Sequence, residues 1–148
     1  MARILWADDE ITSLKPHIIF LENKKHEVLA VNSGNEAIEE FKKSSFDIVF
    51  LDENMPGMSG LKALEIIKKI QPNVPVIMIT KSEEEMIMEE AIGKQISDYL
   101  IKPVNPNQIL MAIKKQIDSK RLISETNTST YQQKFREISN DLNSSLNL

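Results

Sequence analysis

Short runs of apolar residues alternate along the chain with longer segments in which apolar residues recur every three or four positions. The short runs, bounded by turn residues, predict five strands, over residues 4–7, 28–31, 48–51, 74–79 and 98–101. The longer segments predict five helices, over residues 13–23, 35–43, 61–70, 83–92 and 106–120. The run at 48–51 is apolar throughout, as expected of a strand that is buried on both faces.

Residues suited to helix ends support these boundaries. Pro16 lies in the first turn of the first predicted helix, where a missing N–H costs little. Ser33 is suited to cap the second helix, and Asn105 the last, with Pro106 at the first helical position. The regular alternation of strand and helix predicts an α/β fold, in which a parallel sheet is covered by helices on both faces.

Composition narrows the possible functions. The chain has 148 residues, which suits a single domain, and its net charge of −4 argues against direct binding to nucleic acid. The absence of cysteine excludes disulfides, thiolate metal sites and a cysteine nucleophile. Two histidines, His17 and His26, are too few for a histidine-rich zinc site, and we expect both at the surface. No apolar run reaches the length of a membrane span, so we expect a soluble, cytoplasmic chain.

Polar side chains follow each predicted strand. They are Asp8 and Asp9, Asn32 and Ser33, Asp52 to Asn54, Thr80, and Lys102. In the strand order 2-1-3-4-5, one of the two common orders for such sheets, the first and third strands are neighbours, so their three aspartates meet in one pocket. Carboxylates packed this closely repel one another. A Mg²⁺ ion, which binds oxygen ligands, would compensate their negative charge.

Two further strand ends complete the predicted pocket. Lys102 supplies a positive charge and Thr80 a hydrogen-bond donor, and both suit phosphoryl oxygens. The pattern therefore predicts a site that places a phosphoryl group on a carboxylate.

Four separated segments resemble the receiver domains of two-component response regulators. They are Ile4-Leu5-Trp6-Ala7-Asp8-Asp9-Glu10, the segment from Leu51 to Gly60, Ile79-Thr80, and Tyr99-Leu100-Ile101-Lys102-Pro103. The resemblance covers residues 2–120 in order and at the family's spacing. It implies a flavodoxin-like (βα)₅ sheet of strand order 2-1-3-4-5 and a switch that a sensor histidine kinase phosphorylates, rather than an enzyme that turns over an outside substrate.

The resemblance also implies a metal site. Asp52 is then the phosphoacceptor, and Asp9 and Asp52 ligate Mg²⁺ together with the backbone carbonyl of Asn54. Asp8 acts on the metal through water.

The same resemblance also implies roles for residues on the opposite side of the pocket. Lys102 pairs with the phosphoryl group, and Lys102-Pro103 is a cis bond. Thr80 swings inward to bond the phosphoryl group, and Tyr99 follows from an exposed to a buried position. The surface of residues 83–120 then changes and controls a phosphorylation-dependent homodimer, to which Met86, Ile87, Tyr99 and Leu110 could offer apolar area.

Departures from the family pattern leave two alternatives open. Lys81 stands where the family usually has a small residue, and it could narrow the entrance to the pocket or add a charge beside the phosphoryl group. Lys81 is the only support for an interaction module that works without phosphorylation. A Mg²⁺-dependent phosphatase of the haloacid-dehalogenase type would need an aspartate two residues after its nucleophile, where this chain has Asn54.

The polarity of the chain changes after the predicted receiver. We expect a receiver over residues 1–121, a linker over 122–130, and over 131–148 either a frayed end or a helix with one apolar stripe that needs a partner. The run 101–110 together with this tail resembles PorX-type response regulators. In these the receiver leads through a helical bundle to an alkaline-phosphatase-like (PglZ) effector domain and acts in type IX secretion, so we expect an effector domain beyond this chain.

Overall fold

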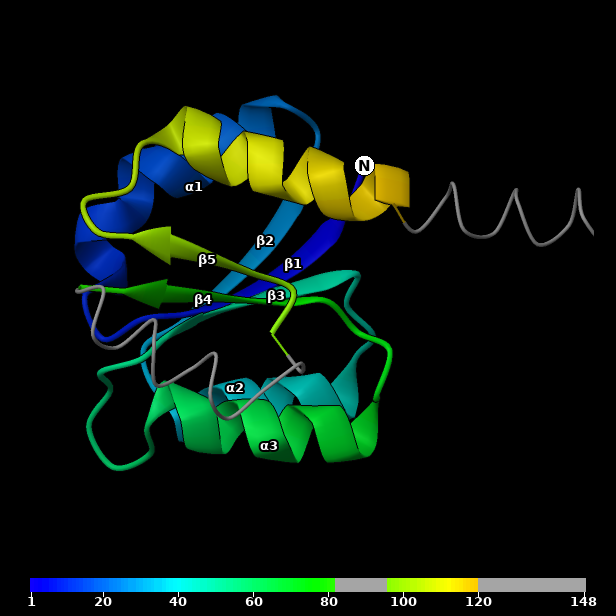
Figure 1. The fold of residues 1–148 in the computed structure, drawn as a ribbon. Coiled ribbons are helices and arrows are strands. Elements are labelled where there is room, and N and C mark those ends of the chain that lie inside the picture. The colour runs from blue at the N-terminus through cyan, green and yellow to red at the C-terminus, as the bar shows by residue number, and fades with distance from the viewer. Residues whose placement is uncertain (82–95, 120–148) are drawn as a thin grey trace, which may run out of the picture. The chain divides into compact units, whose positions relative to one another are not determined.

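A parallel five-stranded sheet forms the centre of the computed structural model, which describes residues 1–81 and 96–119 (Figure 1). The strands are β1 (Arg3–Ala7), β2 (Glu27–Val31), β3 (Ile48–Asp52), β4 (Val76–Thr80) and β5 (Asp98–Ile101). Their order is β2-β1-β3-β4-β5, and every pair is parallel. The predicted fold class and strand order are confirmed.

Helices lie between the first four strands and after the last strand. They are the short 3₁₀ helix η1 (Ile11–Leu14), α1 (Lys15–Asn23), α2 (Gly34–Lys43), α3 (Gly60–Ile70) and a last helix over residues 106–119. The chain divides into two units, Met1–Ile113 and Lys114–Leu148, and 114–119 is the described part of the second. The helix predicted over 83–92, with Met86 and Ile87, and the tail predicted over 122–148 lie outside the described residues. Among the described helices, none is long and apolar enough to cross a membrane.

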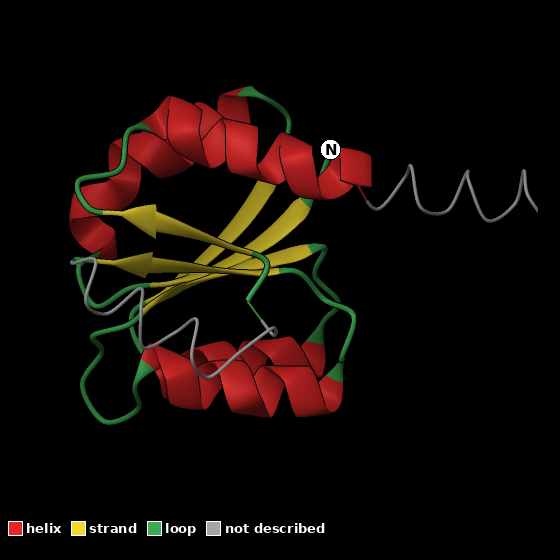
Figure 2. Ribbon diagram, in the orientation of Figure 1, coloured by secondary structure: helices red, strands yellow, loops and turns green. Residues whose placement is uncertain are grey.

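The first unit has three layers. Helices α2 and α3 cover one face of the sheet, and α1 lies on the other face together with the start of the helix at 106 (Figure 2). Successive side chains of a strand point to opposite faces of the sheet. Leu5, Val49 and Met78 point to the face covered by α2 and α3 and belong to the core there. Trp6 points the other way, where its ring lies 5.4 Å from that of Phe50. Strands β3 and β4 are buried along their whole length, whereas β5 is partly exposed.

The predicted caps are confirmed at two helices. Ser33 Oγ accepts a hydrogen bond from Glu36 N at 3.1 Å and caps α2. Asn105 Oδ1 accepts from Gln108 N at 3.1 Å, and Asn105 N donates to Gln108 Oε1 at 2.9 Å. These reciprocal bonds fix where the last helix begins, directly after the loop that carries Lys102.

Two predicted starts were wrong by two residues. The first helix does not begin at Ser13, because residues 11–14 form the 3₁₀ turn η1 and α1 begins only at Lys15. The fourth strand does not begin at Val74, because Val74 N donates to Gln71 O within a turn and Pro75 has no N–H to give to the sheet. Strand β4 therefore begins at Val76 and extends to Thr80.

Both histidines are half-buried and hydrogen-bonded, although we expected them at the surface. His17 Nε2 bonds the carbonyl oxygen of Val104, and His26 Nδ1 accepts from Ala2 N at 3.0 Å. Burial, followed by the nearby positive amino terminus, lowers the pKa of His26. The structure therefore favours the neutral form of His26 as an acceptor.

Acid should weaken the fold through His26. Above the ordinary histidine pKa of about 6.5, both the folded and the unfolded chain keep this group neutral, and its contribution to stability is complete. As the pH falls from there through the lowered folded pKa, the unfolded chain binds the proton first, so the free energy of unfolding decreases. Urea unfolding from about pH 7.5 to about pH 5 should show a smaller decrease in His26→Asn than in the wild type. An equal decrease in the free energy of unfolding in the two proteins would show that His26 is not the source of the acid sensitivity.

Candidate functional site

The carboxyl edge of the sheet gathers the polar residues predicted from the strand ends. Asp8 follows β1 directly, Asp52 ends β3, Thr80 ends β4 and Lys102 follows β5. The parallel register aligns these ends, with Asp52 opposite Ile79 and Thr80 opposite Ile101. Asp8, Asp52 and Thr80 are the buried polar residues of the described part of the chain, at 0%, 1% and 0% exposure.

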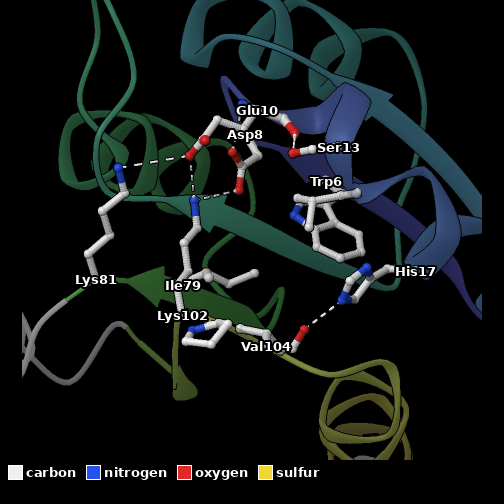
Figure 3. A pocket seen from close by; sticks show the side chains of 11 residues that line it. Trp6, Asp8, Glu10, Ser13, His17, Ile79, Lys81, Lys102 and Val104 are labelled. Carbon is white, nitrogen blue, oxygen red and sulfur yellow. Dashed lines mark hydrogen bonds and ion pairs between the residues drawn. The ribbon is translucent and has the colours of Figure 1, made fainter.

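The ammonium group of Lys102 lies between the two buried carboxylates. Its Nζ is 3.1 Å from Asp8 Oδ2 and 3.4 Å from Asp52 Oδ1 (Figure 3 shows Lys102 with Asp8). A buried charge is costly unless it is paired, so these contacts are what allow both aspartates to lie inside the protein. The sequence prediction that Lys102 flanks the carboxylates agrees with this geometry.

The pocket shifts the pKa values of its charged groups. Burial, and then the charge of Asp8, raises the pKa of Asp52 to about 7, although Lys102 opposes the shift. Burial alone would lower the pKa of Lys102, but the carboxylates of Asp8 and Asp52 outweigh it and raise that pKa. One ammonium group therefore does not fully compensate two carboxylates at this depth.

Local hydrogen bonds fix the turn that carries Asp8. Asp8 N donates to Val31 O at 3.1 Å, and Ile11 N donates to Asp8 O at 3.1 Å. The Asp8 carboxylate accepts from Glu10 N at 2.8 Å through Oδ1. The second oxygen is left to point at Lys102, so the turn determines which oxygen faces the pocket.

The acidic residues fit a divalent cation. The carboxylates of Asp8, Asp9 and Glu10 have oxygens within 4.8 Å of one another. The side chain of Asp9 also interacts with that of Asp52, whose buried Oδ2 has no hydrogen-bond partner in the described structure. Such an excess of hard oxygen ligands over cations is the donor set that Mg²⁺ prefers.

The rim of the pocket contains a residue that we did not assign from the sequence. Glu10 Oε1 is 3.7 Å from Lys102 Nζ and 3.8 Å from Lys81 Nζ (Figure 3). Both Glu10 and Lys81 are more than half exposed, so these pairs are weak. The acidic run that starts at Asp8 was the available signal for Glu10, but the run alone does not reveal its lysine partners.

The remaining predicted residues lie close by but less deep. Asn54 is exposed in the loop after β3. Tyr99 is half-buried on β5 and packs against the core under α2 and α3, so it has neither the fully exposed nor the fully buried position expected of a switch. The Lys102-Pro103 peptide bond is cis, as predicted.

The loop after β3 closes tightly on Gly60. Gly60 N donates to Glu53 O at 3.0 Å, and Ser59 caps α3 by accepting from Lys62 N at 3.2 Å. A Cβ atom on Gly60 would lie 2.3 Å from Asp52 O and 2.9 Å from Glu53 Cα. Only glycine therefore allows α3 to begin this close to the peptide that carries Asp52.

Residues 4–114 match the sequence family described as the response regulator receiver domain. The chain belongs to this family. The receiver is 35% identical over 83 residues to the chemotaxis protein CheY of Thermotoga maritima, a match that covers 56% of this chain and 69% of that protein. It is 32% identical over 108 residues to the signal transduction histidine-protein kinase BarA of Escherichia coli K12, covering 72% of this chain.

Solved structures agree with this family. A response regulator receiver domain from Clostridium thermocellum superimposes with a TM-score of 0.75 at 35% identity, covering 83% of this chain and 99% of that one. A CheY-like receiver from Methanospirillum hungatei gives 0.74 at 29% identity, covering 82% and 97%. Other relatives are longer, since the receiver spans 12% of BarA and 26% of the E. coli transcriptional regulatory protein ZraR.

Replacing Gly60 with alanine should displace the backbone of Asp52 and Glu53. We expect Gly60→Ala to lower the free energy of unfolding by about 1–3 kcal/mol in urea denaturation, because the overlap is with backbone atoms that cannot turn away. Gly57→Ala is the comparison, since its Cβ would meet no atom closer than 3.8 Å but its φ is +84°. It should cost about 1 kcal/mol from backbone strain alone. If Gly57→Ala lowered the free energy of unfolding more than Gly60→Ala, the close approach of Gly60 to the backbone would not be what requires glycine there.

Proposed function

We propose that Asp52 accepts a phosphoryl group from a sensor histidine kinase and that this modification activates the receiver. The observation that carries the proposal is the Lys102 ammonium group, which lies 3.4 Å from Oδ1 of the buried Asp52, while Asp52 Oδ2 has no hydrogen-bond partner among the described residues. Membership in the receiver family supports the same reaction.

The reaction forms a mixed anhydride. An Asp52 carboxylate oxygen attacks the phosphorus of a kinase phosphohistidine, the P–N bond breaks, and the imidazole leaves with the bonding electrons. Such a transfer depends mainly on alignment and on neutralising the charge of the equatorial oxygens. Lys102 would donate to one of these oxygens.

A Mg²⁺ ion would be held by Asp9, Asp52 and the backbone carbonyl of Asn54, with Asp8 acting through water. When bound, it would neutralise charge on the phosphoryl oxygens. The cluster of carboxylate oxygens from Asp8, Asp9 and Glu10 supports a cation at this edge of the sheet.

We further propose that Thr80 and Tyr99 report the modification. The Thr80 hydroxyl would turn toward the phosphoryl oxygens, and Tyr99 would move from its half-buried position to a buried one. The resulting change over residues 83–120 would drive dimerisation and control an effector domain beyond this chain. The receiver, which we place at residues 1–121, would then belong to a PorX-type regulator with an alkaline-phosphatase-like effector in type IX secretion.

Acetyl phosphate with Mg²⁺ should add one phosphoryl group to the wild-type chain, as measured by intact mass. Asp52→Asn should abolish the addition, because it removes the nucleophilic carboxylate while keeping the shape of the side chain. Asp47→Asn is the matched control, since Asp47 accepts a backbone hydrogen bond from Arg3 at 2.7 Å at the opposite end of the sheet. It should be modified like the wild type.

Three outcomes would contradict this proposal. An unmodified wild type would leave the alternative of an interaction module that does not use phosphorylation. Modification of Asp52→Asn would place the phosphoryl group elsewhere. Rapid turnover of an added phosphate ester would favour the phosphatase alternative.

Beryllofluoride, which stands in for the phosphoryl group, should convert the Mg²⁺-loaded chain from monomer to dimer in analytical ultracentrifugation. Ile101 and Met111 support an apolar contact within residues 83–120, since they are 37% and 62% exposed. Met111→Glu should prevent the dimer, because a charge would be buried in the contact. Ile19→Glu is the control on α1, where Ile19 is 48% exposed, and it should still dimerise. Dimerisation without beryllofluoride, or its persistence in Met111→Glu, would refute this prediction.

A further inference from the structure

The loop that carries Lys102 is less firmly supported than the strands that carry the aspartates. Strand β5 is the edge of the sheet and is partly exposed, whereas β3 is buried throughout. Lys102 N donates to Thr80 O at 2.7 Å, which fixes the start of the loop. The chain then passes through exposed Pro103 and half-buried Val104 before the last helix begins.

A cavity of about 390 Å³ lies beside this loop. Its walls include Trp6, His17, Lys102 and Val104 (Figure 3). Close packing normally fixes side chains and loops in a protein interior. On the side of the cavity the loop therefore has less close packing, which gives more weight to the directed contacts that hold it there.

His17 provides one such contact from α1. Its Nε2 lies 2.5 Å from the carbonyl oxygen of Val104, a residue 87 positions away in the sequence. A carbonyl oxygen only accepts, so Nε2 must carry the proton. The bond thus ties the loop, two residues after Lys102, to a helix on the same side of the sheet.

The other side of His17 rests on the core. Its ring lies edge-on to that of Trp6, with the centroids 6.4 Å apart. Trp6 is fully buried in β1 and packs against Phe50 of β3. His17 therefore stands on the rigid part of the sheet and reaches across to the loop at its edge.

We propose that His17 is a positioning residue for phosphoryl transfer, which holds Val104 and thereby keeps the Lys102 ammonium group between Asp8 and Asp52. The inference rests on the proposed function for the role of Lys102. His17 itself does not touch the reacting atoms. It acts through the loop, so its effect on the reaction exists only while Lys102 is present.

The test measures the rate of phosphorylation by acetyl phosphate with saturating Mg²⁺ in the full chain. His17→Gln keeps a donor near the position of Nε2, whereas the shorter His17→Asn does not reach Val104. We expect His17→Asn to react about tenfold more slowly, because small misplacements of a reacting group have large effects, and His17→Gln to stay within about twofold of the wild type. His26→Asn, the same change at the other histidine, should react at the wild-type rate.

The Lys102→Ala background separates positioning from a general effect on the fold. There, His17→Asn should cause no further slowing. Equal slowing with and without Lys102, equal slowing in His17→Gln and His17→Asn, or a wild-type rate in His17→Asn would each overturn the proposal.

A second readout does not depend on phosphorylation. In the unmodified chain labelled with ¹³C-lysine, the Cε signal of Lys102, assigned by its loss in Lys102→Ala, should shift in His17→Asn but not in His17→Gln or His26→Asn. An unchanged signal in His17→Asn would overturn the positioning role even if the phosphorylation assay failed. A wild type that accepts no phosphoryl group but shows this shift would overturn the proposed function alone.

Discussion

The ion pairing of one ammonium group with two buried carboxylates is the constraint on which the rest of this receiver depends. Asp8 and Asp52 are almost fully enclosed, and each would be costly in the interior as an unpaired charge. Lys102 reaches both of them, but it leaves the carboxylates in excess, as the raised pKa of Asp52 shows. The pocket is thus stable enough to fold and still favours a further cation. That imbalance follows from the positions of three strand ends rather than from any single residue.

The sheet holds the two aspartates of the pocket more firmly than it holds Lys102. Asp8 follows β1 and Asp52 ends β3, and both strands lie inside the sheet with neighbours on each side. Lys102 follows β5 at the edge, next to a cavity. The core therefore fixes the two carboxylates. The position of the Lys102 ammonium group depends instead on a few directed contacts from Thr80, Asp8 and α1. The weaker structural support therefore lies on the side of Lys102.

The sequence predicted what depends on periodicity and on the ends of strands. Alternating strands and helices imply a parallel sheet, and a parallel sheet brings residues such as Asp8, Asp52 and Lys102 to one edge whatever the loops do. The contacts of single side chains between distant segments could not be predicted in this way. His17 was expected at the surface because nothing in its neighbourhood indicates Val104 as a partner. The start of α1 was also misplaced, since a 3₁₀ turn and the first turn of an α-helix have similar apolar spacing.

Glu10 and Lys81 show how the rim of the pocket differs from its interior. The residue after Thr80 was expected either to narrow the entrance or to add a charge there, and Lys81 pairs with Glu10, which also faces Lys102. These rim groups are largely in water, so their pairing contributes little to the stability of the fold. Exposed charges at an entrance act mainly on the approach of a charged partner, an effect that salt screens. The interior charges therefore govern what the pocket can hold, whereas the rim charges act on the approach of charged groups to it.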